Sequence, residues 1–331
     1  MKKLKWLAMV LVMTVALVGC QGKKSETKQG EQSGKTEVTI GYFDNITHAQ
    51  ALLMKHDKTL EEKFGDQVSV KWQSFNAGPA EVEALFAGDV DLGYIGPVPA
   101  ITANVKSKGD VVVLSSATKA GAVLLKRKGV EINSVKDLDG KTVAIPQLGN
   151  TQHLCLLHLL TENDLKPDTA GGTVKVTAVA NADVENMMER GDIDAALVPE
   201  PWGATLLSKG AELVLDADQV YENGEYDVAV VVVRKEFLKE HEDLVTKFME
   251  AHKAATEEVD KKEIETLSKI NDQINEETGK SLTTDILQEA FTRIGLSNDI
   301  NKEAMQGFAN ISKEEEFISE IPDDASLYVE E

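Results

Sequence analysis

The sequence lacks the short motifs of the common catalytic and nucleotide-binding chemistries. Nothing in its 331 residues matches the Gly-x-Ser-x-Gly turn of serine hydrolases or the Gly-x₄-Gly-Lys-Ser/Thr loop that binds phosphates. His153 and His158 are five residues apart, whereas two metal ligands on one helix face stand four apart. We therefore predict a protein that is not an enzyme and that has neither a metal site nor a cofactor.

Cysteine is scarce, and the sequence contains two, Cys20 and Cys155. Cys155 lies among leucines, which predicts a buried, unreactive thiol. Cys20 follows a basic head and an apolar run from Trp6 to Val18, shorter than the roughly 20 residues of a membrane-spanning helix. This pattern predicts a lipoprotein signal peptide over residues 1–19 and lipidation of Cys20, which would anchor the protein to the cell membrane on its extracytoplasmic face. The alternatives are an ordinary signal peptide with a chance cysteine, or an anchor helix that stays uncut.

Positive charge is also scarce. The chain has 35 lysines and arginines against 56 aspartates and glutamates, a net charge of −21. Nucleic acids are bound by basic surfaces, so we expect no nucleic-acid partner. An anionic ligand remains compatible with this composition, because local dipoles decide binding at a site.

Residues 20–36 are predicted to form a flexible tether, because no apolar side chain follows Cys20 in this stretch. The folded part then begins near Glu37 and is long enough for two domains of ordinary size. Once Cys20 is acylated, no disulfide can form within the chain, so the exported fold must be stable without one.

From Glu37 onward, short β-rich runs alternate with helical stretches, which is typical of βαβ units around a mainly parallel sheet. Gly88-Asp89-Val90-Asp91 is echoed by Gly191-Asp192-Ile193-Asp194, and in both segments a helix ends at glycine before a short buried strand. The echo favours two similar lobes over chance. After Val233 the pattern is almost purely helical.

Strand-to-helix junctions are the candidate ligand sites, because open α/β sheets bind ligands beyond the carboxyl ends of their strands. Free N–H groups and the helix dipole favour an anion there. Each junction alone is ordinary helix capping, but together they predict a cleft for a small anion between the two lobes. Five junctions stand out, at residues 45–48, 75–80, 94–99, 146–152 and 198–202.

Four segments carry a family resemblance: Phe75–Ala80, Gly88–Gly96, Asp137–Ala144, and Gly191–Ala196 together with Glu200–Trp202. Through them the chain resembles the substrate-binding proteins of ABC importers for nitrate, taurine and aliphatic sulfonates. The resemblance implies an α/β fold of the type II periplasmic-binding-protein kind, with two lobes of mainly parallel sheets, a hinge and a helical C-terminal extension. It also implies a small-molecule anion as ligand, with ABC permease and ATPase subunits as partners of a monomeric binding protein.

The same resemblance assigns residues 37–119 and 228–331 to lobe 1 and residues 120–227 to lobe 2. It also implies that the C-terminal helices pack on lobe 1. A histidine, His153, stands where close relatives are expected to have an acid or a small residue, and a protonated His153 would suit an anion. By residue match, the implied ligand-binding residues are Asn45, His48, Gly78, Gly96, Asn150, Thr151, Gln152, Glu200 and Trp202.

The ligand itself stays open among several candidates. The resemblance puts taurine or another aliphatic sulfonate first, with nitrate or a thiamine-pyrimidine precursor as alternatives. A pyrimidine needs aromatic stacking surfaces, for which Tyr42, Phe43, Tyr94 and Trp202 are the candidates. Enzymes of related fold that make this pyrimidine need a cysteine cluster, which the chain lacks. A sensor or surface-binding domain without transport is the alternative class.

Overall fold

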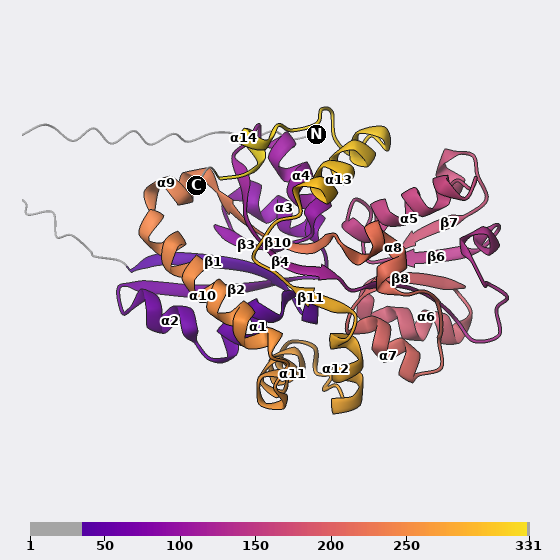
Figure 1. Cartoon of the computed structure of the whole chain (residues 1–331), viewed down its shortest axis with the longest axis horizontal. Helices are drawn as coiled ribbons and strands as arrows, with labels where there is room; N and C mark the ends of the chain where they lie inside the picture. Colours follow the sequence, from indigo (N-terminus) through magenta and orange to yellow (C-terminus); the bar gives the residue numbers. More distant parts are fainter. Residues whose placement is uncertain (1–34, 330–331) are drawn as a thin grey trace, which may run out of the picture. The chain divides into compact units, whose positions relative to one another are not determined.

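Two β-sheets organise residues 35–329, the part of the chain that the computed structural model describes (Figure 1). The predicted signal peptide, Cys20 and most of the predicted tether lie outside these residues. The first sheet has the strand order β11-β4-β10-β3-β1-β2, and the second has the order β7-β6-β8-β5-β9. The strands are β1 (Thr36–Phe43), β2 (Val68–Phe75), β3 (Leu92–Ile95), β4 (Val111–Ala120), β5 (Ala122–Lys126), β6 (Thr142–Ile145), β7 (Lys175–Ala178), β8 (Ala195–Pro199), β9 (Glu212–Leu215), β10 (Asp227–Arg234) and β11 (Ile294–Leu296).

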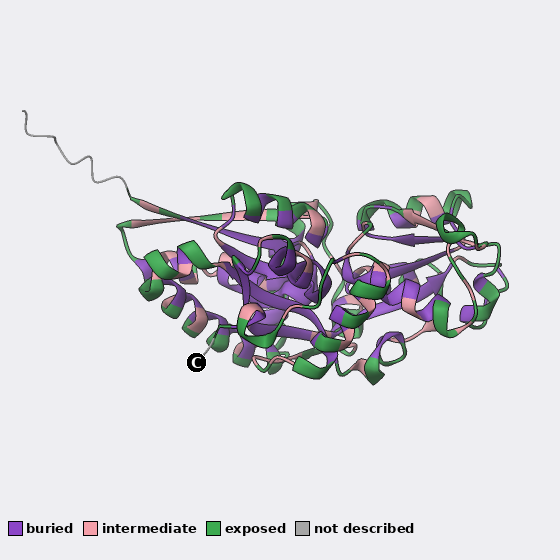
Figure 2. Cartoon of the chain, turned by 90° about the horizontal axis from the view of Figure 1, so that it is seen from above, coloured by how far each residue is buried: buried purple, intermediate pink, exposed green. Residues whose placement is uncertain are grey.

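Helices cover the faces of both sheets, and Figure 2 shows their exposed sides turned away from largely buried strands. No helix among the described residues is long and apolar enough to span a membrane. The α-helices are α1 (Ala49–His56), α2 (Thr59–Phe64), α3 (Gly78–Ala87), α4 (Pro97–Lys106), α5 (Thr151–Glu162), α6 (Val184–Arg190), α7 (Trp202–Ser208), α8 (Ala217–Val220), α9 (Lys235–Glu240), α10 (Glu242–Asp260), α11 (Ile264–Thr278), α12 (Thr284–Phe291), α13 (Lys302–Glu314) and α14 (Asp324–Leu327).

Both sheets are mixed, so the prediction of mainly parallel sheets is wrong in this respect. Among the described strands, four of the nine pairings are parallel: β1 with β2 and β3, and β6 with β7 and β8. The antiparallel pairings of β5 and β10 have one physical cause. Each of these strands follows a passage of the chain from the other sheet, so it runs opposite to the strands of the local βα units.

The chain crosses twice between lobe 1, built on the first sheet, and lobe 2, built on the second. One crossing joins β4 to β5 through Ala120 and Gly121, which have φ values of 56° and 84°. The other precedes β10 and also contains left-handed residues, including Gly224 at φ 80°. The two crossings lie side by side, because the Ala120 N–H donates to the Tyr226 carbonyl oxygen over 3.0 Å. Left-handed backbone at both crossings fits a hinge.

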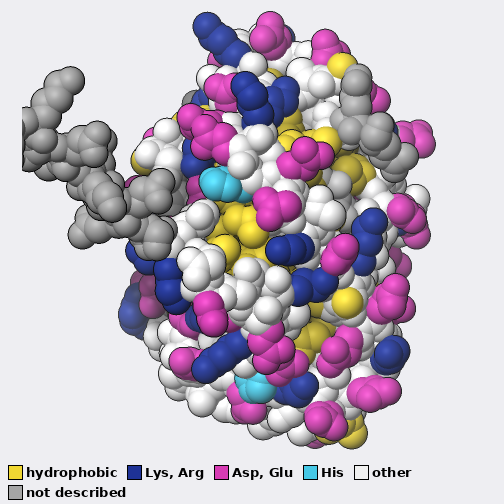
Figure 3. Space-filling view, turned by 90° about the vertical axis from the view of Figure 1, so that its left-hand side faces the viewer, with side chains coloured by type: hydrophobic (Ala, Val, Ile, Leu, Met, Phe, Trp, Pro, Cys, Tyr) yellow, Lys and Arg dark blue, Asp and Glu magenta, His cyan; other side chains and the backbone are white. Residues whose placement is uncertain are grey.

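The C-terminal helices contact both lobes rather than lobe 1 alone. Helices α10 and α11 pack against α1, whereas α12 contacts α7 and α13 contacts α5. The contact of α12 has a clear basis in its sequence, because Leu287, Ala290 and Phe291 form a buried apolar face. On the molecular face in Figure 3, acidic and basic side chains are interspersed around small hydrophobic patches.

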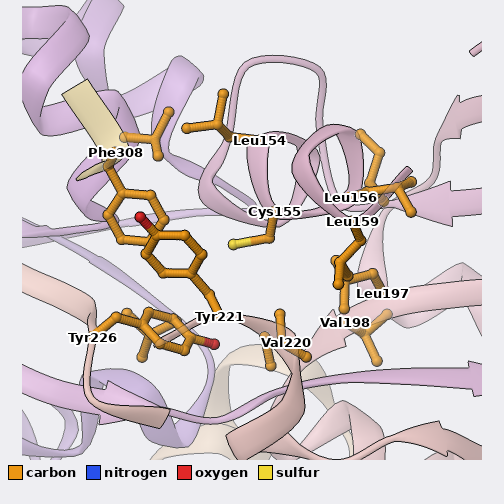
Figure 4. Close-up of a cluster of buried hydrophobic side chains, with 14 of the residues drawn as sticks. Leu154, Cys155, Leu156, Leu159, Leu197, Val198, Val220, Tyr221, Tyr226 and Phe308 are labelled. Carbon is orange, nitrogen blue, oxygen red and sulfur yellow. The ribbon is translucent and has the colours of Figure 1, made fainter. Parts of the chain in front are cut away.

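Cys155 lies in an apolar cluster with Tyr221, Tyr226 and Phe308, as Figure 4 shows. The ring of Tyr221 stacks on Phe308 of α13 at 4.4 Å, and Tyr226 meets the same ring edge-on at 5.9 Å. Cys155 is 1% exposed, and burial raises the pKa of its thiol to about 12. The predicted buried thiol is confirmed.

Glu81 is an unusual buried acid on α3. Its carboxyl group is fully buried, and neither oxygen has a hydrogen-bond partner within residues 35–329. Two glycines make room for it, since an added Cβ on Gly41 or Gly93 would come within 2.1 or 2.3 Å of its Oε1. Burial raises the pKa of this carboxyl well above its ordinary value of 4.5, so the folded protein holds the neutral acid.

We expect Glu81 to make the protein less stable as the pH rises. Below its unfolded-state pKa, such an acid is protonated in both states and does not lower the free energy of unfolding. As the pH rises from that value toward the higher folded-state pKa, the free energy of unfolding falls. For one proton, the free energy of unfolding falls by at most about 1.4 kcal/mol per pH unit. Urea unfolding between pH 5 and 7 should show this extra slope in the wild type and not in Glu81→Met. Equal slopes in the two proteins would contradict the prediction.

Candidate functional site

A small cavity lies between the two lobes where several helices begin. It measures about 20 Å³, the volume open to the centre of a water molecule. The Asn76 side-chain amide donates across the gap to the Pro146 carbonyl oxygen over 3.3 Å, so the lobes are in contact at this edge. The lining residues are Phe43, Asn45, Thr47, His48, Asn76, Ala77, Gly78, Gly96, Pro99, Pro146, Asn150, Thr151, Gln152, Asn181, Pro199 and Val228.

Lobe 2 contributes the start of α5 to this cavity. Asn150 caps the helix, because its Oδ1 accepts from the His153 N–H over 2.8 Å. The Asn150 amide nitrogen also donates to the Gln152 Oε1 over 2.9 Å, which leaves the Gln152 amide N–H groups free for a ligand. The Thr151 hydroxyl is buried and has no hydrogen-bond partner in the described structure. The first N–H groups of the helix likewise have no acceptor within it.

Lobe 1 contributes a second set of donors from the segment after β1. Asn45 caps a short 3-10 helix, Ile46–His48, and its Oδ1 accepts from the Thr47 N–H over 3.1 Å. The His48 Nδ1 accepts from the Phe43 N–H over 3.1 Å, so Nε2 carries the proton of the neutral ring. The ring stacks on Phe43 at 4.2 Å, which fixes its orientation.

Two glycines bring the lobe 1 backbone close to the cavity. Gly78 is the first residue of α3, and an added Cβ would lie 2.2 Å from the Pro99 side chain. Gly96 precedes α4, and an added Cβ would lie 2.4 Å from the Thr151 Oγ1 of the other lobe. Both positions therefore require glycine for packing, and both place a helix start at the cavity.

The cavity is rich in donors but has no charged side chain. Its described lining contains amides, hydroxyl groups and one imidazole, and no lysine, arginine, aspartate or glutamate. Burial lowers the pKa of His48 to about 3, so the imidazole is a neutral donor. The starts of α3, α4 and α5 converge here, and each such helix end favours a negative charge by about 0.3–1 kcal/mol. The arrangement suits an anion with several acceptor oxygens.

We expect His48 to stay neutral between pH 5 and 8 and to bind as a donor without a charge. The lowered pKa follows from burial of the ring, which is 1% exposed. Histidine NMR signals followed from pH 5 to 8 should show no titration of this ring. A midpoint near pH 6 for His48 would contradict the prediction.

Seven of the nine predicted ligand-binding residues line this cavity, and Glu200 and Trp202 do not. The fully buried carboxylate of Glu200 accepts from the Ala204 N–H over 2.9 Å and from Arg293 over 3.2 Å. Trp202 lines a different cavity next to α12. The sequence places both residues just beyond a strand end, but it does not show which way their side chains turn.

The expectation that a protonated His153 would suit the anion is wrong. The ring stacks on Phe317 at 5.2 Å, and its Nδ1 accepts from the Gly149 N–H over 3.0 Å. Burial lowers its pKa to about 4, and the ring does not line the anion cavity. Of the four aromatic candidates for stacking a pyrimidine, Phe43 alone is in the described lining, because Tyr42 and Tyr94 are fully buried in the core and Trp202 lines a different cavity.

Sequence reasoning missed two amide side chains, Asn76 and Asn181. Asn76 lies in one of the selected junctions and in a segment that carries the family resemblance, but it was not among the implied ligand-binding residues. Asn181 follows β7 at the start of a 3-10 helix, Asn181–Asp183, and its Oδ1 is buried without a partner among the described residues. Asn181 could have been found from the sequence, because it stands at a strand-to-helix junction, as the residues of the five selected junctions do.

Comparison with known proteins places the chain in a family. The sequence profile of the NMT1-like family matches residues 31–270, more than half of the chain. This protein belongs to the NMT1-like family. Over 218 residues it is 31% identical to the taurine-binding periplasmic protein of Escherichia coli (strain K12), a match that covers 66% of this chain and 64% of that relative's length.

Solved structures show the fold of this NMT1-like protein. The alkanesulfonate-binding protein of Xanthomonas axonopodis pv. citri, solved bound to MOPS, superposes with a TM-score of 0.71 at 20% identity, over 87% of this chain and 95% of that one. The periplasmic nitrate-binding protein of Synechocystis PCC 6803 superposes with a TM-score of 0.67 at 15% identity, over 88% and 83%. The predicted periplasmic-binding-protein fold is confirmed. These relatives are named as binding proteins and not as enzymes.

Proposed function

We propose that this protein is the solute-binding component of an ABC importer and that it captures a small oxyanion between its lobes. One observation carries the proposal: an uncharged, donor-rich cavity at three helix starts contains a buried Thr151 hydroxyl without a partner in the described structure. A buried donor with no acceptor is unfavourable, and a ligand oxygen would satisfy it. The likeness to taurine- and alkanesulfonate-binding proteins supports a sulfonate as that ligand.

The closed cleft supports the same mode of binding. Donors come from Asn45 and His48 in lobe 1 and from Thr151 and Gln152 in lobe 2. An anion held by both sets favours the closed state, which an importer's permease could then recognise. A micromolar site needs about −8 kcal/mol, which a few such hydrogen bonds to a charged group can supply.

Nitrate is the second candidate, because the cavity of about 20 Å³ suits a small ion. The likeness to a nitrate-binding protein points the same way. A thiamine-pyrimidine precursor has less support, since Phe43 is the one aromatic side chain apart from His48 in the described lining, and it already stacks on His48.

The setting of the protein follows from the proposed function and the N-terminal sequence. We propose that Cys20 carries the lipid anchor and that residues 20–35 tether the binding unit to the extracytoplasmic face of the cell membrane; the predicted tether ends one residue earlier than expected, because Thr36 already pairs with Val68 in β1. The partners would be a permease and an ATPase, with the binding protein acting as a monomer. Metabolic labelling with a palmitate analogue should mark the wild type and not Cys20→Ala.

A thermal-shift panel tests the ligand class. Taurine, longer alkanesulfonates, nitrate, a phosphonate and the thiamine pyrimidine would each be added to the purified protein. A true ligand at a hundred times its dissociation constant stabilises the fold by about 2.7 kcal/mol. The proposal fails if no oxyanion raises the melting temperature.

A pair of threonine variants tests the site. Thr151→Ala should weaken the binding of the active oxyanion by roughly tenfold through loss of one charge-assisted hydrogen bond. Thr161→Ala is the matched control, because Thr161 is exposed at the other end of α5. Equal affinities of the two variants would place the anion elsewhere.

A further inference from the structure

A buried acid lies behind one of the helix starts at the anion cavity. Glu81 is in the first turn of α3, three residues after Gly78, which lines the cavity. Three residues are less than one full turn of an α-helix. The Glu81 side chain is fully buried, and it is not part of the described lining. Glu81 therefore lies in the layer behind the cavity wall.

Two strands lead from this carboxyl group to the cavity. The group lies beside Gly41 of β1 and Gly93 of β3, because an added Cβ on either glycine would collide with its Oε1. The two glycines are opposite each other in the parallel pairing of these strands. Phe43, two residues after Gly41, and Gly96, three residues after Gly93, both line the cavity. At about 3.3 Å per strand residue, the carboxyl group is roughly 7–10 Å from the cavity wall.

Nothing in the described structure compensates a negative charge on this acid. Neither carboxyl oxygen has a hydrogen-bond partner within residues 35–329. Burial alone raises the pKa of Glu81, and no neighbouring charge contributes to the rise. The site therefore accommodates the neutral acid. The ionisable side chains of α3 itself and of the surrounding α4, β1, β2 and β3 are Glu83, Lys106, Glu37, Tyr42, Lys71 and Tyr94.

A bound anion would be sensitive to a charge on Glu81. The described lining of the anion cavity has no lysine or arginine that could offset the charge of a ligand. An ionised Glu81 would also oppose the favourable dipole at the start of α3. Two unit charges roughly 10 Å apart, at an effective dielectric constant of about 20, repel each other enough to change an affinity by roughly tenfold.

We propose that Glu81 couples anion binding to a proton: the site binds its anion while this acid is protonated and loses affinity when the proton leaves. The inference rests on the proposed function and adds a regulation of the same site. Glu81 acts through its charge and does not contact the ligand. By linkage, a bound anion raises the pKa of Glu81 further. Affinity is therefore highest at low pH, and it falls between the pKa of the ligand-free protein and the higher pKa of the complex.

Calorimetric titration of the purified protein across pH tests the inference. The probes are nitrate and methanesulfonate, which stay fully ionised from pH 5.5 to 9 because both are anions of strong acids. In the wild type, the affinity for a probe that binds should fall at least about threefold from pH 5.5 to 9. Titrations in buffers of different ionisation enthalpy should show proton uptake on binding over the same range. Constant affinity without proton uptake would overturn the inference and leave the oxyanion function standing.

Glu81→Gln separates the charge of this residue from its shape, because the amide resembles the neutral acid and cannot ionise. This variant should bind the probe at pH 5.5 within about twofold of the wild type and keep that affinity at pH 9. Glu81→Met, which also cannot ionise, should likewise show no dependence on pH. Glu83→Gln is the matched control, because Glu83 is exposed on the same helix, and it should keep the wild-type dependence.

Two further outcomes count against the inference in different ways. Glu200, whose pKa burial raises to about 7, also titrates in this range. If Glu81→Gln and Glu81→Met keep the wild-type pH dependence, another group such as Glu200 causes it, and the inference is wrong while the oxyanion function stands. If neither probe binds to the wild type at any pH, the sulfonate and nitrate functions both fail and the inference fails with them.

Discussion

Replacing Arg293 with methionine is expected to lower the free energy of unfolding by about 3–5 kcal/mol at pH 8. The guanidinium group donates to the carboxylates of Glu200 over 3.2 Å, Asp216 over 2.8 Å and Glu289 over 2.8 Å. The Glu200 side chain is fully buried, and that of Arg293 is 10% exposed. Without the arginine, a buried carboxylate loses its cationic partner, and a second and third acid remain nearby.

The expected loss depends on pH. Burial raises the pKa of Glu200 to about 7, although the Ala204 N–H and Arg293 oppose that rise. Removing Arg293 would raise this pKa further. An acid whose pKa is raised in the folded state costs the least stability at low pH, where it is protonated in both the folded and the unfolded protein. Urea unfolding at pH 5 and pH 8 should therefore show the smaller loss at pH 5, where the bonds to Asp216 and Glu289 still account for part of it.

A double variant identifies the cause of the loss. Arg293→Met combined with Glu200→Gln removes the buried charge along with its partner, so it should be more stable at pH 8 than Arg293→Met alone. If the double variant is no more stable, the uncompensated charge of Glu200 is not the source of the loss. Arg190→Met is the matched control, because Arg190 pairs with Asp192 on the surface and its side chain is 64% exposed.

The same ion pair shows why Glu200 could not be placed correctly from the sequence. The Glu-Pro-Trp segment follows a buried strand at a helix start, which is where ligand-binding acids are found. The residue that determines its role is Arg293, 93 positions later in a segment predicted as plain helix. That segment instead contains the short strand β11, Ile294–Leu296, which pairs with β4. Three-residue edge strands depend on their partner, and local sequence does not reveal them.

Other parts of the fold could be predicted because their signals are local. The sequence pattern predicts a helix over Ala49–His56 and a strand over Ala122–Lys126, and these are the bounds of α1 and β5 in the structure. Seven candidate site residues come together because the carboxyl ends of strands in a βα fold meet at one edge. The direction of each strand could not be predicted from local sequence, because it depends on where the chain crosses between the sheets.

Substituting Gly96 with alanine is expected to weaken ligand binding by roughly 5- to 150-fold, as a cost of about 1–3 kcal/mol for overpacking implies. An added Cβ would lie 2.4 Å from the Thr151 Oγ1, and these two atoms belong to different lobes. The backbone at Gly96 has φ −67°, which alanine adopts without strain. Because the clashing atoms belong to different lobes, we expect the clash in the closed cleft and not in an open one, so the ligand-free protein should keep its melting temperature within about 2 °C.

Calorimetric titration with the sulfonate that the wild type binds measures this effect, with Gly295→Ala as the matched control. A Cβ on Gly295 would lie 3.7 Å from Lys119, an ordinary contact distance. Thr151→Ala removes both the clashing oxygen and a proposed ligand donor, so adding Gly96→Ala to it should weaken binding little further. Fully additive losses would mean that Gly96 acts through its own contact with the ligand. The non-additive result would show that affinity depends on how closely Gly96 and Thr151 approach each other when the lobes close.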